Sequence, residues 1–104
     1  MKESDINKSS EEFRNYAHQF VDWMADYMKN VEKYPVKSQV EPRGVYDKIN
    51  DKIPTKSESL DNIFQDFKDL IIPGITHWQS PNYFAYFPAN TSPPSILAEM
   101  LSST

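Results

Sequence analysis

Apolar side chains recur at helical spacing along the first third of the chain. With a rotation of about 100° per residue, the apolar and aromatic positions of residues 13–31 fall within an arc of about 160°, and polar side chains fill the other side. Ser9 or Ser10 is the expected N-cap, and the glutamates at 11–12 suit the positive end of a helix dipole. The pattern predicts a helix of roughly 33 Å ending near Val31, after a disordered polar lead over residues 1–8.

The apolar side of this predicted helix is rich in aromatic rings. It carries Phe13, Tyr16, Phe20, Trp23 and Tyr27. Each of these side chains can bury on the order of 150–250 Å², and the remaining apolar segments of the chain are short. We therefore expect part of this face to pack against another chain or another domain.

Two shorter helices are predicted farther along. Residues 60–71 have an apolar stripe at helical spacing, with Ser59 as N-cap and a Pro-Gly stop at 73–74. Ser92 can cap a third helix with Pro93 at its first position, where the missing N–H costs nothing. The apolar residues of this third helix follow the same helical spacing.

The connections between these helices are expected to be largely irregular. Residues 34–43 contain two prolines and should be extended, whereas residues 46–53 should form a short turn or helix before Pro54. The predicted fold class is mainly α: three helices joined by extended proline-containing and aromatic segments. Such a chain is not a complete domain.

Composition narrows the function classes. The net charge of -4 and the lack of a basic stripe argue against nucleic-acid binding. The absence of cysteine excludes disulfides and thiolate nucleophiles. The first residues lack the apolar core of a signal peptide, and no run approaches the ~20 apolar residues of a membrane span. A cytoplasmic protein without a membrane or nucleic-acid partner is the plain expectation.

Catalytic and metal motifs are scarce. Gly44 and Gly74 are the only glycines, so a glycine-rich phosphate loop is excluded. His18 and His77 lack the spacing of metal ligands, and His18 falls on the polar side of the first helix. A nucleophile pair of His77 and Ser80 has no supporting signature. The sequence therefore predicts no catalytic, cofactor-binding or metal residue in this chain.

The aromatic stretch HWQSPNYFAYFPA, residues 77–89, leaves two alternatives open. Its rings could fill a core or an interface, which is the commoner use of such residues, either as a short strand or as an extended segment. Pro81 and Pro88 stiffen the stretch at both ends, and a stiff edge lined by rings suits recognition of a planar apolar group. Spacing alone does not choose between packing and a pocket wall.

The longer stretch IIPGITHWQSPNYFAYFPA resembles the N-terminal segment of pyridoxal-phosphate-dependent group II amino acid decarboxylases of the aromatic L-amino acid decarboxylase type. That family includes tyrosine and tryptophan decarboxylases. The resemblance covers residues 11–103, and its HW-x-S-P-x-x-F-A-Y-F-P core is specific. It implies a homodimeric carboxy-lyase that converts an aromatic L-amino acid to its amine. Residues 9–104 would then be a helical dimerisation segment that extends a fold-type I (α/β) enzyme.

The resemblance also implies roles for particular residues. Contacts with the aromatic side chain of the substrate and its surroundings are implied for Trp78, Tyr86, Phe87 and Pro88. Ala89 stands where some family members have a threonine that touches the substrate, so this chain lacks that hydroxyl. The implied dimer interface lies on the apolar side of the first helix, at Phe13, Phe20, Trp23, Met24 and Tyr27.

The family's cofactor, pyridoxal 5'-phosphate, is bound by residues that correspond to positions beyond 104, and no lysine here sits in a comparable motif. We therefore expect a chain that is truncated before the large cofactor domain and inactive alone. The alternative is a stand-alone helical module that binds another protein through its aromatic helix. The resemblance leaves open which amino acid is the substrate, and whether the parent enzyme forms an amine or an aldehyde.

Overall fold

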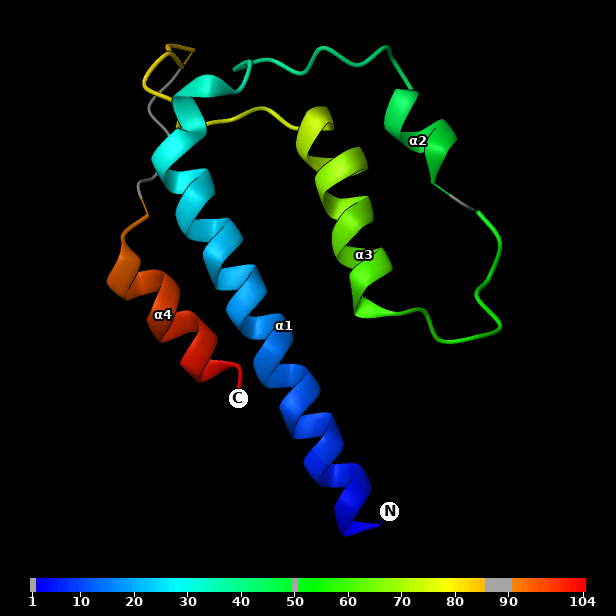
Figure 1. The fold of residues 1–104 in the computed structure, drawn as a ribbon. Helices are drawn as coiled ribbons and strands as arrows, with labels where there is room; N and C mark the ends of the chain where they lie inside the picture. Colours follow the sequence, from blue (N-terminus) through cyan, green and yellow to red (C-terminus); the bar gives the residue numbers. More distant parts are fainter. Residues whose placement is uncertain (1, 50, 86–90) are drawn as a thin grey trace.

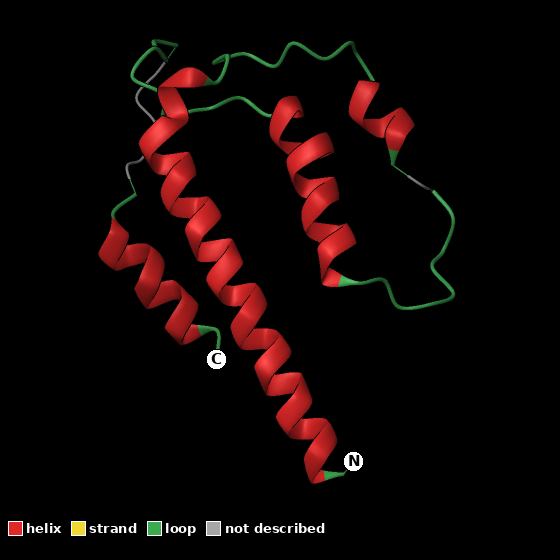
Figure 2. Cartoon of the chain, in the orientation of Figure 1, coloured by secondary structure: helices red, strands yellow, loops and turns green. Residues whose placement is uncertain are grey.

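The computed structural model describes residues 2–49, 51–85 and 91–104, and in these ranges the chain is helical, without strands (Figure 2). The α-helices are α1 (Glu3–Asn30), α2 (Gly44–Lys48), α3 (Leu60–Asp66) and α4 (Pro93–Ser102). Shorter turns are η1 (Val31–Lys33), the π-helical turn η2 (Phe67–Ile71) and η3 (Ile72–Gly74). The prediction of a mainly α architecture is confirmed.

The first helix begins earlier than predicted. It starts at Glu3, and Lys2 at its N-cap makes no side-chain capping hydrogen bond. Residues 3–8 therefore extend α1 instead of forming a disordered lead, and the expected caps at 9–10 lie inside the helix. Two physical features favour this extension: Glu3 is acidic in the first turn, and Ile6 lies two turns before Phe13, on the same side of the helix.

Helices α1 and α3 run side by side in the same direction (Figure 1). This arrangement is possible because the chain leaves α1, crosses one end of the molecule, passes through α2 and returns along residues 51–59 before α3 begins. Rings join the two helices: Phe20 lies 4.4 Å from Phe64 and Trp23 lies 5.1 Å from Phe67, measured between ring centroids. In the same view α4 runs in the opposite direction to α1.

Local capping signals place α3 and α4 where the sequence predicts them. The Ser59 hydroxyl accepts a hydrogen bond from the Asn62 N–H at 3.2 Å. Ser92 and Ser95 form a reciprocal capping box at the start of α4. Since each cap satisfies backbone donors that the helix itself leaves unpaired, it fixes the first residue of its helix.

Helix α2 is the short element expected near 46–53, but it lies slightly earlier and ends at Lys48. Its N-cap Arg43 has a positive φ of 65°. The Arg43 guanidinium lies over the Tyr46 ring at 4.5 Å. Val45 of α2 packs directly against Gly74, and a Cβ added at Gly74 would collide with the Val45 Cγ2.

The described residues form only a small core. Ile72 is the buried hydrophobic side chain, at 6% exposure. The chain exposes 9054 Å², about half as much again as the roughly 6000 Å² expected for a compact protein of its mass. Its radius of gyration of 17.0 Å also exceeds the ~13 Å of a compact domain of this length. Much of the apolar surface is therefore left open.

Candidate functional site

The aromatic segment begins at a buried histidine. His77 is 3% exposed and Ser80 is 5% exposed. The His77 N–H donates to the Val36 carbonyl at 3.0 Å, the Ser80 N–H donates to the His77 carbonyl at 3.1 Å, and the Tyr83 N–H donates to the Ser80 carbonyl at 3.1 Å. The described part of the segment, residues 77–85, is thus a series of turns anchored on the 34–43 connection, and it is not a strand.

The His77 imidazole lies between two tyrosines. Its Nδ1 is 2.6 Å from the Tyr27 hydroxyl on α1. The centroid of its ring is 5.6 Å from that of Tyr27 and 4.8 Å from that of Tyr34. Tyr27 in turn stacks on Trp23 at 5.2 Å with an interplanar angle of 15°. A continuous set of rings therefore connects α1 to the start of the aromatic segment.

Burial favours the neutral form of both side chains. Burial raises the pKa of Tyr27, as does its proximity to Tyr34. Burial lowers the pKa of His77, and a hydrogen bond to the Ile72 backbone opposes that shift. The hydrogen bond between the Tyr27 hydroxyl and the His77 Nδ1 therefore joins two side chains whose neutral forms are favoured by burial.

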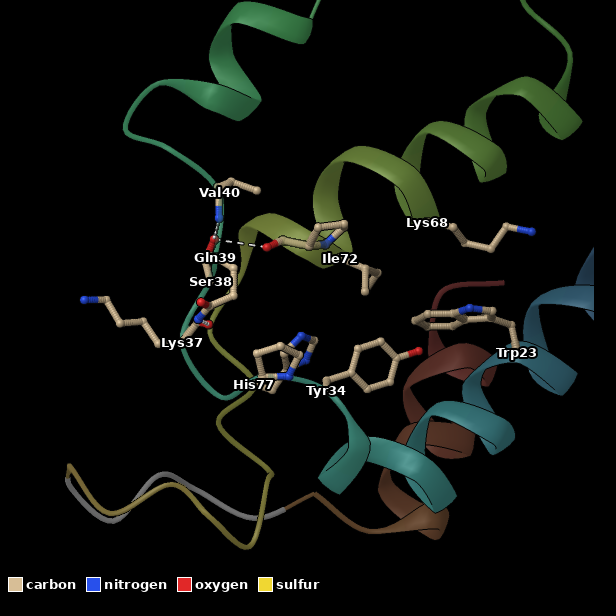
Figure 3. Close-up of a pocket in the computed structure, with 11 residues that line it drawn as sticks. Trp23, Tyr34, Lys37, Ser38, Gln39, Val40, Lys68, Ile72 and His77 are labelled. Carbon is tan, nitrogen blue, oxygen red and sulfur yellow. Dashed lines mark hydrogen bonds between the residues drawn. The ribbon is translucent and has the colours of Figure 1, made fainter.

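A cavity of about 370 Å³ opens beside these rings (Figure 3). Its walls include the rings of Trp23, Tyr34 and His77 together with Ile72 and Pro73. The Ser38 hydroxyl donates to the Pro73 carbonyl at 3.0 Å and fixes the 34–43 connection against η3. The amines of Lys37 and Lys68 extend away from the rings of Tyr34 and His77.

A second hollow, of about 350 Å³, lies between α1 and α3. We call it the α1–α3 groove, and it is lined by Phe20, Trp23, Met24, Ile63, Phe64 and Phe67. These side chains leave almost no polar surface in the groove. The Lys68 ammonium lies over the Phe64 ring, 4.4 Å from its centroid.

The five residues that the resemblance implied for a dimer interface divide into three groups. Phe13 is 68% exposed. Phe20, Trp23 and Met24 are half-buried in the α1–α3 groove. Tyr27 is half-buried against His77. Phe13 and the open side of the groove are therefore accessible to a partner, whereas the Tyr27 hydroxyl is used within the chain.

One of the implied substrate contacts lies in the part of the chain that the structure describes. Trp78 directly follows the buried His77 and is 51% exposed. Phe84, farther along the segment, is 86% exposed. Residues 86–89, which hold the implied contacts Tyr86, Phe87, Pro88 and Ala89, lie outside the described residues.

Sequence reasoning missed the partners of His77. The Ser80 hydroxyl accepts a hydrogen bond from the Asn82 N–H at 3.2 Å, and the His77 Nδ1 faces Tyr27, so both side chains have structural roles. The available signal was the hydroxyl of Tyr27 on an apolar helix face, because a buried tyrosine hydroxyl needs a polar partner. His18 is exposed, as predicted.

Comparison with known proteins identifies the class. Residues 42–104 match the pyridoxal-dependent decarboxylase conserved domain. The tyrosine decarboxylase of Papaver somniferum is 53% identical over 93 residues, which are 89% of this chain and 18% of that protein. The phenylacetaldehyde synthase of Petunia hybrida is 52% identical over 93 residues, again 89% of this chain and 18% of that protein.

A solved structure shows the same arrangement of helices. The crystal structure of Catharanthus roseus tryptophan decarboxylase in complex with L-tryptophan matches with a TM-score of 0.81 at 52% identity. The match covers 89% of this chain and 20% of that one. This chain belongs to the pyridoxal-dependent decarboxylase family, among relatives that act on aromatic amino acids, and it spans about a fifth of their length.

The cavity beside His77 does not fit a pyridoxal phosphate site. Such a site needs a lysine amine free to bond the cofactor aldehyde and an acidic partner for the pyridine nitrogen. The Lys68 ammonium packs over Phe64, Lys37 extends away from the cavity, and no carboxylate is among the described residues that line it. In these same ranges, no group of three or more acidic or histidine side chains is placed to hold a metal ion.

The length and the apolar character of the described helices decide whether any of them could span a membrane. Helix α1 is the longest of them, and it alternates apolar and charged positions. Within the described ranges, none of the helices combines the length and the apolar character that crossing a bilayer requires.

Proposed function

We propose that this chain forms the substrate-side aromatic wall and part of the dimer interface of a pyridoxal-phosphate-dependent carboxy-lyase that converts an aromatic L-amino acid to its amine. The observation that carries the proposal is the match, at 52% identity and a TM-score of 0.81, to a decarboxylase crystallised with L-tryptophan. By the same likeness we propose an aromatic amino acid as the substrate, and we propose a homodimer as the assembly because the chain leaves much apolar surface open.

The proposed wall begins at Trp78. Its backbone is held by the turns around His77, while half of its side chain is open to a ligand. Flat rings on a fixed backbone suit contact with the aromatic side chain of a substrate, because they exclude water and restrict its orientation. We expect Tyr86, Phe87 and Pro88 to continue this wall, and Ala89 to leave an apolar surface where a hydroxyl would otherwise contact the substrate.

The proposed interface explains the open apolar surface. A stable interface of standard size removes about 800 Å² from each partner, whereas this chain exposes roughly 3000 Å² more than a compact protein of its mass. One dimer contact of standard size covers only part of that excess. We therefore expect the second subunit to cover Phe13 and the open side of the α1–α3 groove, and other parts of the enzyme to cover the rest.

The cofactor would be held by residues outside the described ranges. When bound, pyridoxal phosphate supplies the electron sink for loss of carbon dioxide, and the protein supplies orientation and electrostatics. The chain's own contribution is to bind the substrate ring and to hold it in place. A cytoplasmic location stays a prediction.

A chimeric enzyme tests the proposal. The matching 93 residues of the Papaver somniferum tyrosine decarboxylase are replaced by those of this chain, and the purified, cofactor-loaded dimer is assayed with tyrosine, Dopa, tryptophan and phenylalanine. We expect amine and carbon dioxide in equal amounts, with activity within about tenfold of the parent, because the backbone of the exchanged segment is shared.

The parent enzyme prepared in the same way is the control. Aldehyde in place of amine would overturn the assignment of the reaction. A chimera that folds, dimerises and binds the cofactor but releases no carbon dioxide would contradict the wall. Failure to dimerise in the presence of an otherwise folded cofactor domain would favour the stand-alone interaction module.

A further inference from the structure

We propose that Tyr27 is a positioning residue that sets the geometry of the substrate-side wall through His77. This inference rests on the proposed function, since it concerns the wall that begins at Trp78. It adds a residue on α1, outside the aromatic segment, that determines where the wall begins.

The central contact joins two distant parts of the chain. The Tyr27 hydroxyl and the His77 Nδ1 are 2.6 Å apart and separated by 50 residues in sequence. A contact of this length is a short, well-formed hydrogen bond. It ties the C-terminal half of α1 to the first residue of the aromatic segment.

Several contacts hold both the backbone and the ring of His77 in place. Its N–H donates to Val36, its carbonyl accepts from Ser80, and its ring lies against Tyr34 at 4.8 Å. Its side chain is almost fully buried, at 3% exposure. The imidazole therefore has one orientation, and Tyr27 defines it from the α1 side.

The position of Trp78 depends on that orientation. Adjacent Cα atoms are held 3.8 Å apart across a trans peptide, so a shift of the His77 backbone is passed directly to Trp78. Displacing a binding group by about 1 Å can cost up to about 100-fold in rate, and the loss appears in KM where the displaced group binds the substrate and the transition state equally well. Deleting the Tyr27 hydroxyl would leave the buried His77 Nδ1 without its hydrogen-bond partner and allow the imidazole to turn toward another one.

The α1 helix offers a matched control. Tyr16 is also half-buried on α1, and the pKa of its hydroxyl is raised by burial and by its proximity to Asp61 on α3. It lies about three turns before Tyr27. Tyr16→Phe and Tyr27→Phe thus delete the same atom from the same helix, but only Tyr27 contacts the aromatic segment through His77.

The test measures steady-state kinetics of the cofactor-loaded chimeric enzyme with its preferred aromatic amino acid. For Tyr27→Phe we expect KM to rise about tenfold with kcat changed less than about threefold, because the wall acts in substrate binding. Tyr16→Phe should leave KM and kcat within about twofold of the values of the chimera without the substitution. A second variant, His77→Gln, keeps a side-chain acceptor for Tyr27 and should raise KM less than His77→Leu does.

Trp78→Ala separates the two proposals. If Trp78→Ala raises KM while Tyr27→Phe leaves it unchanged, the positioning role is wrong and the wall stands. If neither variant changes KM, the wall itself is wrong. Equal effects of Tyr16→Phe and Tyr27→Phe, or a loss confined to kcat, would also overturn the positioning role, because a general loosening of α1 would explain them.

Discussion

The rings of Phe20 and Phe64 meet with their centroids 4.4 Å apart and their planes tilted at 49°. This contact joins α1 to α3 although the two helices are separated by the whole 34–59 connection. Trp23 extends it with an edge contact to Phe67 at 5.1 Å. The parallel pair of helices is therefore held by aromatic rings, and the same rings form the floor of the α1–α3 groove.

This ring contact predicts a measurable coupling. In a double-mutant cycle of Phe20→Leu and Phe64→Leu in the chimeric enzyme, we expect a coupling energy of about 0.5–1.5 kcal/mol. Local hydrogen exchange of peptides that cover residues 60–71 would report it. The matched cycle of Phe13→Leu with Phe64→Leu should give a coupling near zero, since Phe13 is 68% exposed. Equal coupling in the two cycles would contradict the contact.

The close approach of Gly74 and Val45 predicts that position 74 tolerates no side chain. A Cβ added there would collide with the Val45 Cγ2, so Gly74→Ala should destabilise the 72–76 region by about 1–3 kcal/mol. Thermal unfolding and local hydrogen exchange would measure it. Val45→Ala should restore most of the loss.

Gly44→Ala is the control for that experiment. A Cβ at Gly44 would meet its nearest neighbour, the Val40 Cβ, at 3.5 Å, which is an ordinary contact. The substitution should therefore change stability by less than about 0.5 kcal/mol. If Gly44→Ala were as costly as Gly74→Ala, steric crowding at Gly74 would not be the cause.

The Tyr27–His77 pair predicts a pH window. Because burial lowers the pKa of His77 below 6.5, its contribution to stability is fully present above that value and is lost as pH falls through the folded-state pKa. Because burial raises the pKa of Tyr27 above 10.0, its contribution is fully present below that value and is lost as pH rises through the folded-state pKa. Protection of residues 74–83 against hydrogen exchange, corrected for the intrinsic rate, should be constant between about pH 7 and 9.

A pair of histidine variants tests the acid side of this window. His77→Gln should remove the loss of protection at low pH, since glutamine does not titrate there. His18→Gln should preserve it, since His18 is exposed on α1. Persistence of the acid transition in His77→Gln would assign it to another group.

Phe13 provides a direct test of the proposed interface. It is 68% exposed on the apolar side of α1, and Phe13→Asp would place a charge where the second subunit is expected to pack. We expect the dimer dissociation constant to rise at least about 30-fold, the usual effect of losing an aromatic anchor. Analytical ultracentrifugation of the chimeric enzyme measures it. Asn15→Asp adds the same charge to the polar side of α1 and should leave the dimer intact.

Local signals made most of the helical structure predictable. Ser59 and Ser92 sit immediately before apolar residues at helical spacing, and both act as caps. The start of α1 was harder to predict, because its first residue has no capping side chain and only the continuation of the stripe to Ile6 marks it. A serine inside a helix and a serine at its cap have the same signature in sequence.

The site was predictable only in part, for a different physical reason. The sequence places a tyrosine hydroxyl on an apolar stripe and a histidine before a tryptophan, but nothing local pairs Tyr27 with His77 across 50 residues. Tyr27 and His77 meet because the chain returns along η3 and passes the 34–43 connection. The contact of Ser38 with the Pro73 carbonyl is likewise invisible to periodicity.

The open α1–α3 groove has a practical consequence for anyone who produces residues 1–104 in isolation. The preparation would bring Phe13 and the groove of one molecule into contact with those of the next, and large exposed apolar patches associate without much selectivity. Screening for variants that stay in solution would favour polar substitutions at these same positions. Better-behaved samples would then be obtained by damaging the surface through which we expect the enzyme to assemble.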